Sequence, residues 1–175
     1  MSKVALPPDH RLERLTKSHP RSTFASGSPP VDAWLATKAL QSQSKRLSVT
    51  TALIDGGGRI AGYFTVTSEQ VDFGELPASL TKHLPHRDLT VAVVAWLGVA
   101  ADRQGQGLGR TLFVHALRDC HRAGQTFAFV AVVLDCLDDR AKAFYQRFQF
   151  DELPGYPYRL VLPSAELDAL MAGGE

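Results

Sequence analysis

A turn with three alternating glycines joins two segments of this chain that differ in periodicity. Gly105, Gly107 and Gly109 follow the continuous apolar run 91–100, which predicts a strand buried on both faces. Segment 108–123 after them carries apolar residues at helical spacing. The first N–H groups of a helix lack internal partners and favour anions, and glycines admit a ligand close to the backbone. We therefore predict that this turn binds a phosphate group.

The glycine spacing excludes two common phosphate-binding motifs. No Gly-Lys pair is followed by Ser or Thr, as in the P-loop of ATPases, and GQGLG does not match the dinucleotide-binding pattern GxGxxG. The pattern present is Gln-x-x-Gly-x-Gly, at Gln104, Gly107 and Gly109. It resembles the coenzyme A pyrophosphate loop of the GCN5-related N-acetyltransferase (GNAT) family. The alternative is a turn that needs only a flexible backbone.

This resemblance implies acetyl-CoA as the acetyl donor, without a metal. In the family, the strand before the loop splays from its neighbour and pairs with pantetheine, so the backbones of Leu97 and Val99 are expected to contact the coenzyme. Gly98 between them fits a bulge or a close backbone approach. The other expected coenzyme contacts lie in and just after the loop: Arg103, Gln104, Gly105, Gln106, Gly107, Leu108, Gly109 and Arg110.

A tyrosine in AKAFYQRFQF, residues 141–150, is the candidate catalytic residue. This segment resembles the later signature of the family, in which Phe-Tyr lies on a helix, and Tyr145 takes the tyrosine position. Acetyl transfer to an amine needs N–H donors for an oxyanion and an acid for the departing thiolate. A phenol with a reference pKa of about 10 can be that acid, and the backbone N–H near Leu97 can serve the oxyanion. Core packing is the alternative role for a helical aromatic.

No glutamate stands out as a general base. A lysine acceptor, with a reference pKa near 10.4, would depend on one more than an α-amine, whose reference pKa is about 7.7 to 8.0. The sequence therefore favours an α-amine acceptor.

The chain resembles one branch of the family over residues 10–162, the acetyltransferase toxins of bacterial toxin–antitoxin modules. Residues 24–35, FASGSPPVDAWL, resemble the branch pattern Phe-x-Cys-Gly followed by Leu-Asp-x-Trp-Leu, and IAGYFTV at 60–66 follows its next elements. The resemblance implies acetylation of the α-amine of an aminoacyl-tRNA, which blocks translation. It also implies a homodimer and an antitoxin with a ribbon-helix-helix domain.

Basic residues are concentrated near the N-terminus, although the net charge is only +1. Residues 1–46 carry 8 Lys or Arg against 3 Asp or Glu, whereas residues 150–175 carry 1 against 5. A basic face for a polyanion and an ordinary solvated surface are both compatible with this pattern. The candidate phosphate contacts are Arg11, Arg14, Lys17, Arg21, Lys45 and Arg46.

Several positions depart from the toxin pattern. Trp96 replaces the arginine usual in the central strand, Ala100 replaces an acid, Ser26 a cysteine and Gln149 a glycine, and 87–90 lacks a Pro-x-Pro. We expect coenzyme binding to tolerate these changes, whereas the choice of acceptor stays open. The alternatives are a GNAT enzyme acting on a small amine, a peptide or a protein N-terminus, and an idle acyl-CoA-binding module.

The periodicities predict an α/β protein, and the resemblance specifies the GNAT fold, with a mixed, mostly antiparallel sheet splayed at the acetyl-CoA site and flanked by helices. At 175 residues we expect one domain over 1–175, with its core at 10–162 and flexible termini. The predicted elements are helix 31–44, strands 47–54 and 60–67, strand 91–100, helix 108–123 ended by Gly124, strand 127–134, a helix capped by Asp138 or Asp139, and strands 150–153 and 156–162.

Composition is that of an ordinary globular domain, with 45% hydrophobic and 21% charged residues. No segment approaches the roughly 20 apolar residues of a membrane span, and the N-terminus lacks the apolar centre of a secretory signal. Cys120, Cys136 and the six histidines show no metal-ligand spacing. We therefore expect a cytoplasmic protein without a metal site or membrane contact.

Overall fold

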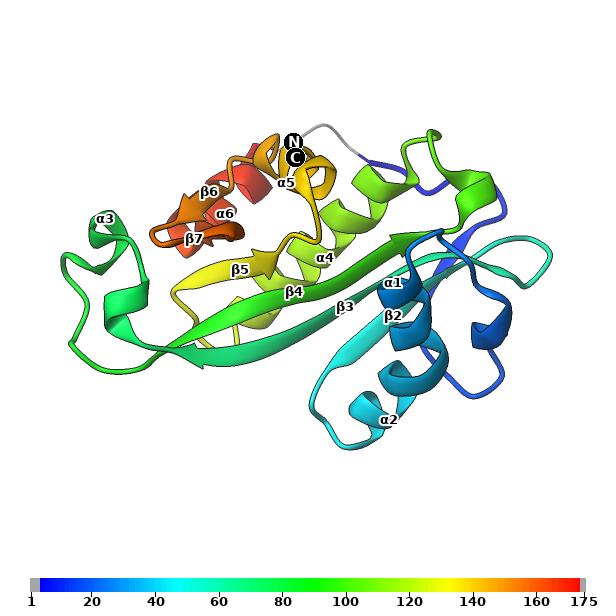
Figure 1. The fold of residues 1–175 in the computed structure, drawn as a ribbon, viewed down its shortest axis with the longest axis horizontal. Helices are drawn as coiled ribbons and strands as arrows, with labels where there is room; N and C mark the ends of the chain where they lie inside the picture. Colours follow the sequence, from blue (N-terminus) through cyan, green and yellow to red (C-terminus); the bar gives the residue numbers. More distant parts are fainter. Residues whose placement is uncertain (1–3, 174–175) are drawn as a thin grey trace. The chain divides into compact units, whose positions relative to one another are not determined.

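The computed structural model describes residues 4–173 (Figure 1). These residues form two compact units. The N-terminal unit comprises residues 4–67 and 94–118, and the C-terminal unit comprises residues 68–93 and 119–173. The prediction of one domain over residues 1–175 stays a prediction. The terminal residues 1–3 and 174–175, which we expected to be flexible, lie outside the described residues.

Three elements run from one unit into the other: β3 (Ile60–Val71), β4 (Leu89–Val99) and α4 (Leu108–Gly124). The N-terminal unit also holds β1 (Arg11–Arg14), η1 (Arg21–Thr23), α1 (Pro29–Ala33), η2 (Trp34–Lys38), α2 (Ala39–Ser44), β2 (Val49–Ile54) and η4 (Ala101–Arg103). The C-terminal unit also holds η3 (Phe73–Glu75), α3 (Ala78–Thr81), β5 (Ala131–Asp135), α5 (Asp139–Gln146), β6 (Asp151–Leu153), β7 (Tyr156–Pro163) and α6 (Ser164–Ala172).

The strands pair in the order β1-β2-β3-β4-β5-β7-β6. Strands β4 and β5 are parallel, with Ala92 opposite Val132, because helix α4 carries the chain back between them. The pairs β1–β2, β2–β3, β5–β7 and β6–β7 are antiparallel. Helices pack against these strands, α2 on β2, and α5 and α6 on β7. The predicted α/β fold class is confirmed.

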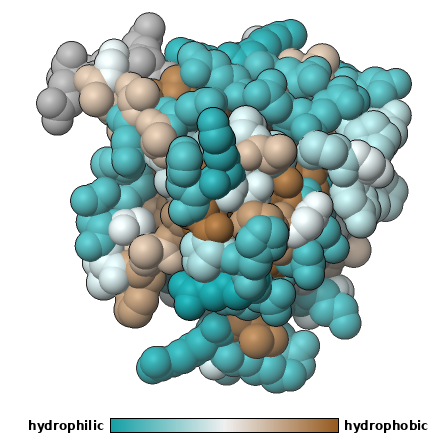
Figure 2. All heavy atoms as spheres, turned by 90° about the vertical axis from the view of Figure 1, so that its left-hand side faces the viewer, coloured by the Kyte–Doolittle hydropathy of each residue, from teal (hydrophilic) through white to brown (hydrophobic). Residues whose placement is uncertain are grey.

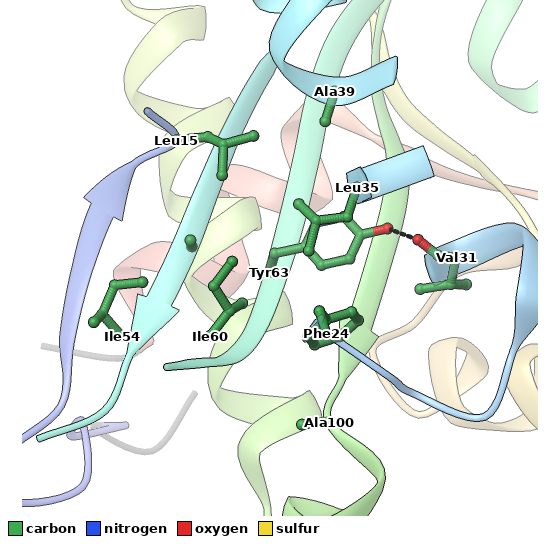
Figure 3. Packing of buried hydrophobic residues seen from close by; sticks show 10 residues of the cluster. Leu15, Phe24, Val31, Leu35, Ala39, Ile54, Ile60, Tyr63 and Ala100 are labelled. Atoms are coloured by element: carbon green, nitrogen blue, oxygen red, sulfur yellow. Dashed lines mark hydrogen bonds between the residues drawn. The ribbon is translucent and has the colours of Figure 1, made fainter. Parts of the chain in front are cut away.

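The core of the N-terminal unit gathers around Tyr63 on β3 (Figure 3). The Tyr63 side chain has no exposed surface, and its hydroxyl donates a 2.6 Å hydrogen bond to the carbonyl oxygen of Val31. Phe24 contacts the Tyr63 ring edge to face at 5.5 Å. Burial of each Leu or Ile around them contributes about 1.5–3 kcal/mol. The cluster therefore holds α1 and the segment before it against the sheet.

Some predicted elements have different ends. The predicted helix 31–44 begins at Pro29, which fits the first turn because proline has no N–H to satisfy, and a π-helical turn interrupts it over Trp34–Lys38. Asp138 caps α5 as predicted, accepting a 2.7 Å hydrogen bond from the Ala141 amide. Strand β3 extends four residues beyond the predicted 67, to Val71.

The predicted strand 127–134 is wrong at its start, because β5 begins only at Ala131. The Phe127 amide donates to the Ala123 carbonyl at the end of α4, and the Phe127 side chain is 78% exposed. Sequence analysis also missed β1, which has only four residues, and α6, whose apolar residues do not follow one stripe. Both give weak periodicity signals.

One face of the surface is shown in Figure 2. It is mostly hydrophilic, and its hydrophobic residues gather in small patches. Within residues 4–173, no helix combines the length and the apolar character that a membrane crossing requires.

Candidate active site

The predicted coenzyme loop connects η4 to α4 within the N-terminal unit. Gly105 and Gly107 have φ angles of +75° and +80°, in the left-handed region that side chains disfavour, and a Cβ at either would meet nothing within 4 Å. The Thr111 amide donates to the Gly107 carbonyl, so α4 begins at this point. The first N–H groups of the helix, those of Leu108, Gly109 and Arg110, therefore have no partner within the helix. The loop presents open backbone beside these donors.

The side chains of Arg103 and Gln104 turn toward the protein. Gln104 donates from Nε2 to the carbonyl oxygens of Ser26 at 2.7 Å and Val99 at 3.0 Å. Arg103 donates from Nη2 to Oδ2 of Asp55 at 3.0 Å. Both side chains support the loop, and their predicted contacts with the coenzyme stay predictions. Sequence analysis missed Asp55 as a partner, because the Asp-Gly-Gly-Gly segment predicts only a turn.

Arg110 is the second arginine, after Arg103, that we expect to contact the coenzyme at this loop. Its side chain is exposed in the first turn of α4, and it forms no ion pair with another described residue. A positive charge at this end of a helix opposes the helix dipole unless an anion lies nearby. Its placement therefore fits a phosphate ligand.

Strand β4 leads into the loop and carries the predicted backbone contacts. Leu97 and Val99 are half-buried, and Gly98 between them is buried. A Cβ on Gly98 would lie 2.5 Å from Cγ1 of Val31, and a Cβ on Gly62 of β3 would lie 2.8 Å from the Gly98 carbonyl oxygen. Gly98 is thus needed for packing of β4 against α1 and β3, and this accounts for the close approach expected from sequence.

Tyr145 lies on α5 in the C-terminal unit and is half-buried. Burial, with a further contribution from the negative charge of Cys136 when it ionises, raises the pKa of the Tyr145 phenol above its ordinary value. Burial and then the charge of Asp135 raise the pKa of Cys136 to about 11. The rings of Phe144 and Tyr145 meet edge to face at 5.0 Å. Tyr145 therefore carries its proton at neutral pH, as a general acid requires.

Hydrogen bonds of Gln43 link two segments of the N-terminal unit that carry part of the predicted basic surface. Gln43 near the end of α2 donates from Nε2 to the carbonyl of Leu15, just after β1, and accepts through Oε1 from the amide of Thr50 on β2. The exposed basic residues flanking these bonds are Arg14, Lys17, Lys45 and Arg46.

The two other candidates are engaged differently. Arg11 forms an ion pair with Glu13, and Arg21 donates to the Ala36 carbonyl at 3.1 Å. Of the six predicted phosphate contacts, these two are held by the protein itself. Among the described residues, no group of three or more His, Cys, Asp or Glu is arranged to hold a metal ion.

A glycine loop with open backbone follows β4, and a tyrosine that keeps its proton lies on α5. Each feature is expected of an acyltransferase that uses a coenzyme A thioester. The chain belongs to the acetyltransferase (GNAT) family, whose family model matches residues 11–150. It is 29% identical over 161 residues to the tRNA-acetylating toxin of Mycobacterium tuberculosis (strain ATCC 25618 / H37Rv), an alignment that covers 90% of this chain and 94% of the toxin.

Solved toxin structures share the fold. A tyrosine-to-phenylalanine mutant of KacT matches with a TM-score of 0.86 and 23% identity over 93% of this chain and 99% of that one. AtaT complexed with acetyl-methionyl-tRNAfMet matches with a TM-score of 0.85 and 22% identity over 93% and 99%. A tyrosine-to-phenylalanine mutant of AtaT, bound to the C-terminus of the antitoxin AtaR and acetyl-CoA, matches with a TM-score of 0.77 and 18% identity over 93% and 98%.

Proposed function

We propose that this chain is an acetyl-CoA-dependent N-acetyltransferase that acetylates the α-amine of an aminoacyl-tRNA and so blocks translation. The observation that carries this proposal is the similarity to a tRNA-acetylating toxin along 90% of the chain. The solved relatives with acetyl-methionyl-tRNAfMet, an acetylated aminoacyl-tRNA of the kind this reaction would form, and with acetyl-CoA support an aminoacyl-tRNA acceptor and an acetyl-CoA donor. Acting on aminoacyl-tRNA would place the protein in the cytoplasm, where translation occurs.

The roles of the residues follow from the chemistry of thioester aminolysis. Acetyl-CoA supplies the acetyl thioester, held at its pyrophosphate by the open amides of the loop and by Arg110. The neutral α-amine of the acceptor forms the new C–N bond, and the C–S bond breaks. The Tyr145 hydroxyl gives its proton to the departing sulfur and takes one back from solvent, and the amine nitrogen loses its own extra proton to solvent. The amide of Leu97 is our candidate for holding the carbonyl oxygen as negative charge develops on it.

The proposed acceptor needs little help from a general base. An α-amine has a reference pKa of about 7.7 to 8.0, so a useful fraction is neutral near pH 7. The exposed basic residues Arg14, Lys17, Lys45 and Arg46 are candidate contacts for the tRNA phosphates, because Lys and Arg side chains supply most sequence-independent affinity for nucleic acids.

We also propose two protein partners. The AtaT structure with a segment of AtaR supports an antitoxin that binds this chain, and we expect that antitoxin to carry a ribbon-helix-helix domain. We expect the active form to be a homodimer. Sedimentation of the purified protein, alone and with the product of an adjacent reading frame, measures both assemblies.

A second candidate function is acetylation of a small amine, a peptide or a protein N-terminus. Trp96 favours it, because this residue replaces an arginine usual in the toxin branch and stacks on Trp34 with ring centroids 5.2 Å apart. If that arginine contributes to tRNA binding, the replacement changes the acceptor.

Transfer of radiolabelled acetyl groups separates these functions. The protein is incubated with labelled acetyl-CoA and either aminoacyl-tRNA, the same tRNA deacylated, free amino acids, or short peptides. We expect label on the aminoacyl-tRNA only, released as N-acetyl amino acid when the ester is hydrolysed. Label on peptides or free amines alone would establish the second candidate. Coenzyme binding without transfer to any acceptor would show an idle binding module.

A further inference from the structure

We propose that two carboxylates outside the glycine loop, Asp55 and Asp32, position that loop for acetyl-CoA; this inference rests on the proposed function. Neither residue belongs to the loop. Asp55 acts through Arg103, and Asp32 acts through Ser26 and Gln104, so both supports end on the two residues that precede Gly105. They are positioning residues rather than ligand contacts.

The side chain of Asp55 is held in place in the turn between β2 and β3. Its carboxylate is 7% exposed, and its Oδ1 accepts hydrogen bonds of 2.9 Å from the amides of Gly57 and Arg59. The Arg59 amide, then the Gly57 amide and the Arg59 side chain, lower the pKa of Asp55 from its ordinary value against the opposing effect of burial. The carboxylate is therefore ionised and oriented, and its Oδ2 accepts from Nη2 of Arg103 at 3.0 Å and, at a longer distance, from Nε of Arg59 at 3.5 Å.

Arg103 links Asp55 to the glycine loop. It is the last residue of η4, its side chain is 29% exposed, and its Nη2 lies 3.0 Å from Oδ2 of Asp55. Its own amide donates to the Ala100 carbonyl at 2.8 Å, which closes the η4 turn. The ion pair thus sets where the chain enters the glycine turn. Partial burial shields this pair from solvent screening more than an exposed surface pair.

Asp32 supports Gln104, the residue after Arg103, by holding Ser26 in place. Its Oδ1 accepts from the Ser26 amide at 2.8 Å and from the Ser26 hydroxyl at 2.6 Å. The carbonyl oxygen of Ser26, held in this way, accepts from Gln104 Nε2 at 2.7 Å, and the same Nε2 also donates to Val99 at 3.0 Å. Gln104 is therefore held between the N-terminal segment and the end of β4.

These supports matter because the loop itself has little to restrain it. Gly105 and Gly107 have no Cβ and nothing packs where one would lie. Glycine loses more conformational freedom on ordering than any other residue, and a ligand that orders a loop loses affinity by that amount. Restraining the residues before Gly105 reduces the conformational freedom that the loop loses when acetyl-CoA binds. We therefore expect the supports to affect coenzyme affinity more than the chemical step.

The test compares Arg103→Gln with Arg122→Gln in the full chain. Arg122 is a matched control, because it forms an ion pair with Asp119 at 3.8 Å at the end of α4 while its own side chain is 79% exposed. Acetyl-CoA binding is measured by calorimetry, together with KM, kcat and thermal stability. For Arg103→Gln we expect about tenfold weaker binding, a matching rise in KM and little change in kcat, since a charge-assisted hydrogen bond is lost. For Arg122→Gln we expect unchanged values.

Two further variants keep the test decisive. Gln104→Leu probes the Asp32 side independently, and Arg103→Lys, which retains the charge, should recover part of the affinity. Wild-type affinity in both Arg103→Gln and Gln104→Leu overturns the positioning role while acetyl transfer stands. Absence of acetyl-CoA binding by the wild-type protein overturns this inference and the proposed function together.

Discussion

The indole ring of Trp96 on β4 stacks on that of Trp34 in η2, with centroids 5.2 Å apart and planes inclined by 13°. Trp34 is further fixed by a 3.1 Å hydrogen bond from its Nε1 to Oγ1 of Thr65. The ring of Trp34 can stack either with a second aromatic ring or with the planar guanidinium of an arginine. The stack therefore explains how Trp96 takes the place of the usual arginine without disturbing the core.

This relationship predicts that Trp96→Arg is tolerated. The guanidinium can stack on Trp34, so we expect a loss of no more than about 1 kcal/mol of unfolding free energy. Trp96→Ala removes the contact altogether and should cost about 2–3 kcal/mol, less than for a fully buried tryptophan. Urea denaturation of both variants measures the difference. Equal losses would show that stacking contributes nothing at this position.

A glycine in the loop should be required for the coenzyme rather than for folding. Gly107→Ala forces a side chain to φ +80°, as Gly155→Ala does at +82° in the β6–β7 turn. Each substitution should cost about 1–2 kcal/mol of stability. Only Gly107→Ala should weaken acetyl-CoA binding in calorimetry. Equal affinities of the two variants would remove the loop from the coenzyme site.

Gly98 should be needed for packing. A Cβ there would lie 2.5 Å from Val31 and 3.2 Å from Tyr63, so Gly98→Ala should destabilise the protein by about 1–3 kcal/mol through overpacking. Val31→Ala in the same chain removes the closer contact. The double mutant should therefore be less destabilised than the sum of the two single mutants, as measured by chemical denaturation. Strict additivity would contradict the packing explanation.

Removal of the Tyr145 hydroxyl should slow the reaction without preventing coenzyme binding. For Tyr145→Phe we expect kcat to fall by about 10²–10⁴-fold, the usual contribution of a general acid, with acetyl-CoA affinity retained. Phe144→Leu, on the same helix, is the control for altered packing and should keep most of the activity. A fully active Tyr145→Phe would leave Tyr145 as a packing residue.

The raised pKa of Tyr145 predicts the shape of the pH profile. A general acid must be protonated, and raising its pKa keeps the proton in place to higher pH. The rate should therefore rise as the acceptor amine deprotonates near its reference pKa of about 7.7 to 8.0, and should not decline by pH 9 to 10, where an unperturbed phenol begins to ionise. Measurements of kcat from pH 6 to 10 test this. A falling limb centred below pH 9 would point to a different acid.

The sequence by itself determined the features that depend on residues close to one another along the chain. The strand, glycine turn and helix around Gly107 are visible because a buried strand, a positive φ and helical periodicity each leave a local pattern. The cap of α5 by Asp138 is equally local, since the side chain bonds an amide three residues away. The family resemblance is carried by these same segments.

Only the tertiary structure decided what the polar side chains around the loop do. Gln104 bonds Ser26 across 78 residues of sequence, and Arg103 bonds Asp55 across 48. No periodicity records such a partner, because the distance between the two groups is set by how β2, β3 and β4 pack after the chain has folded. For the same reason, the stacking of Trp96 on Trp34 belongs to the tertiary structure, because the two rings come from segments about 60 residues apart.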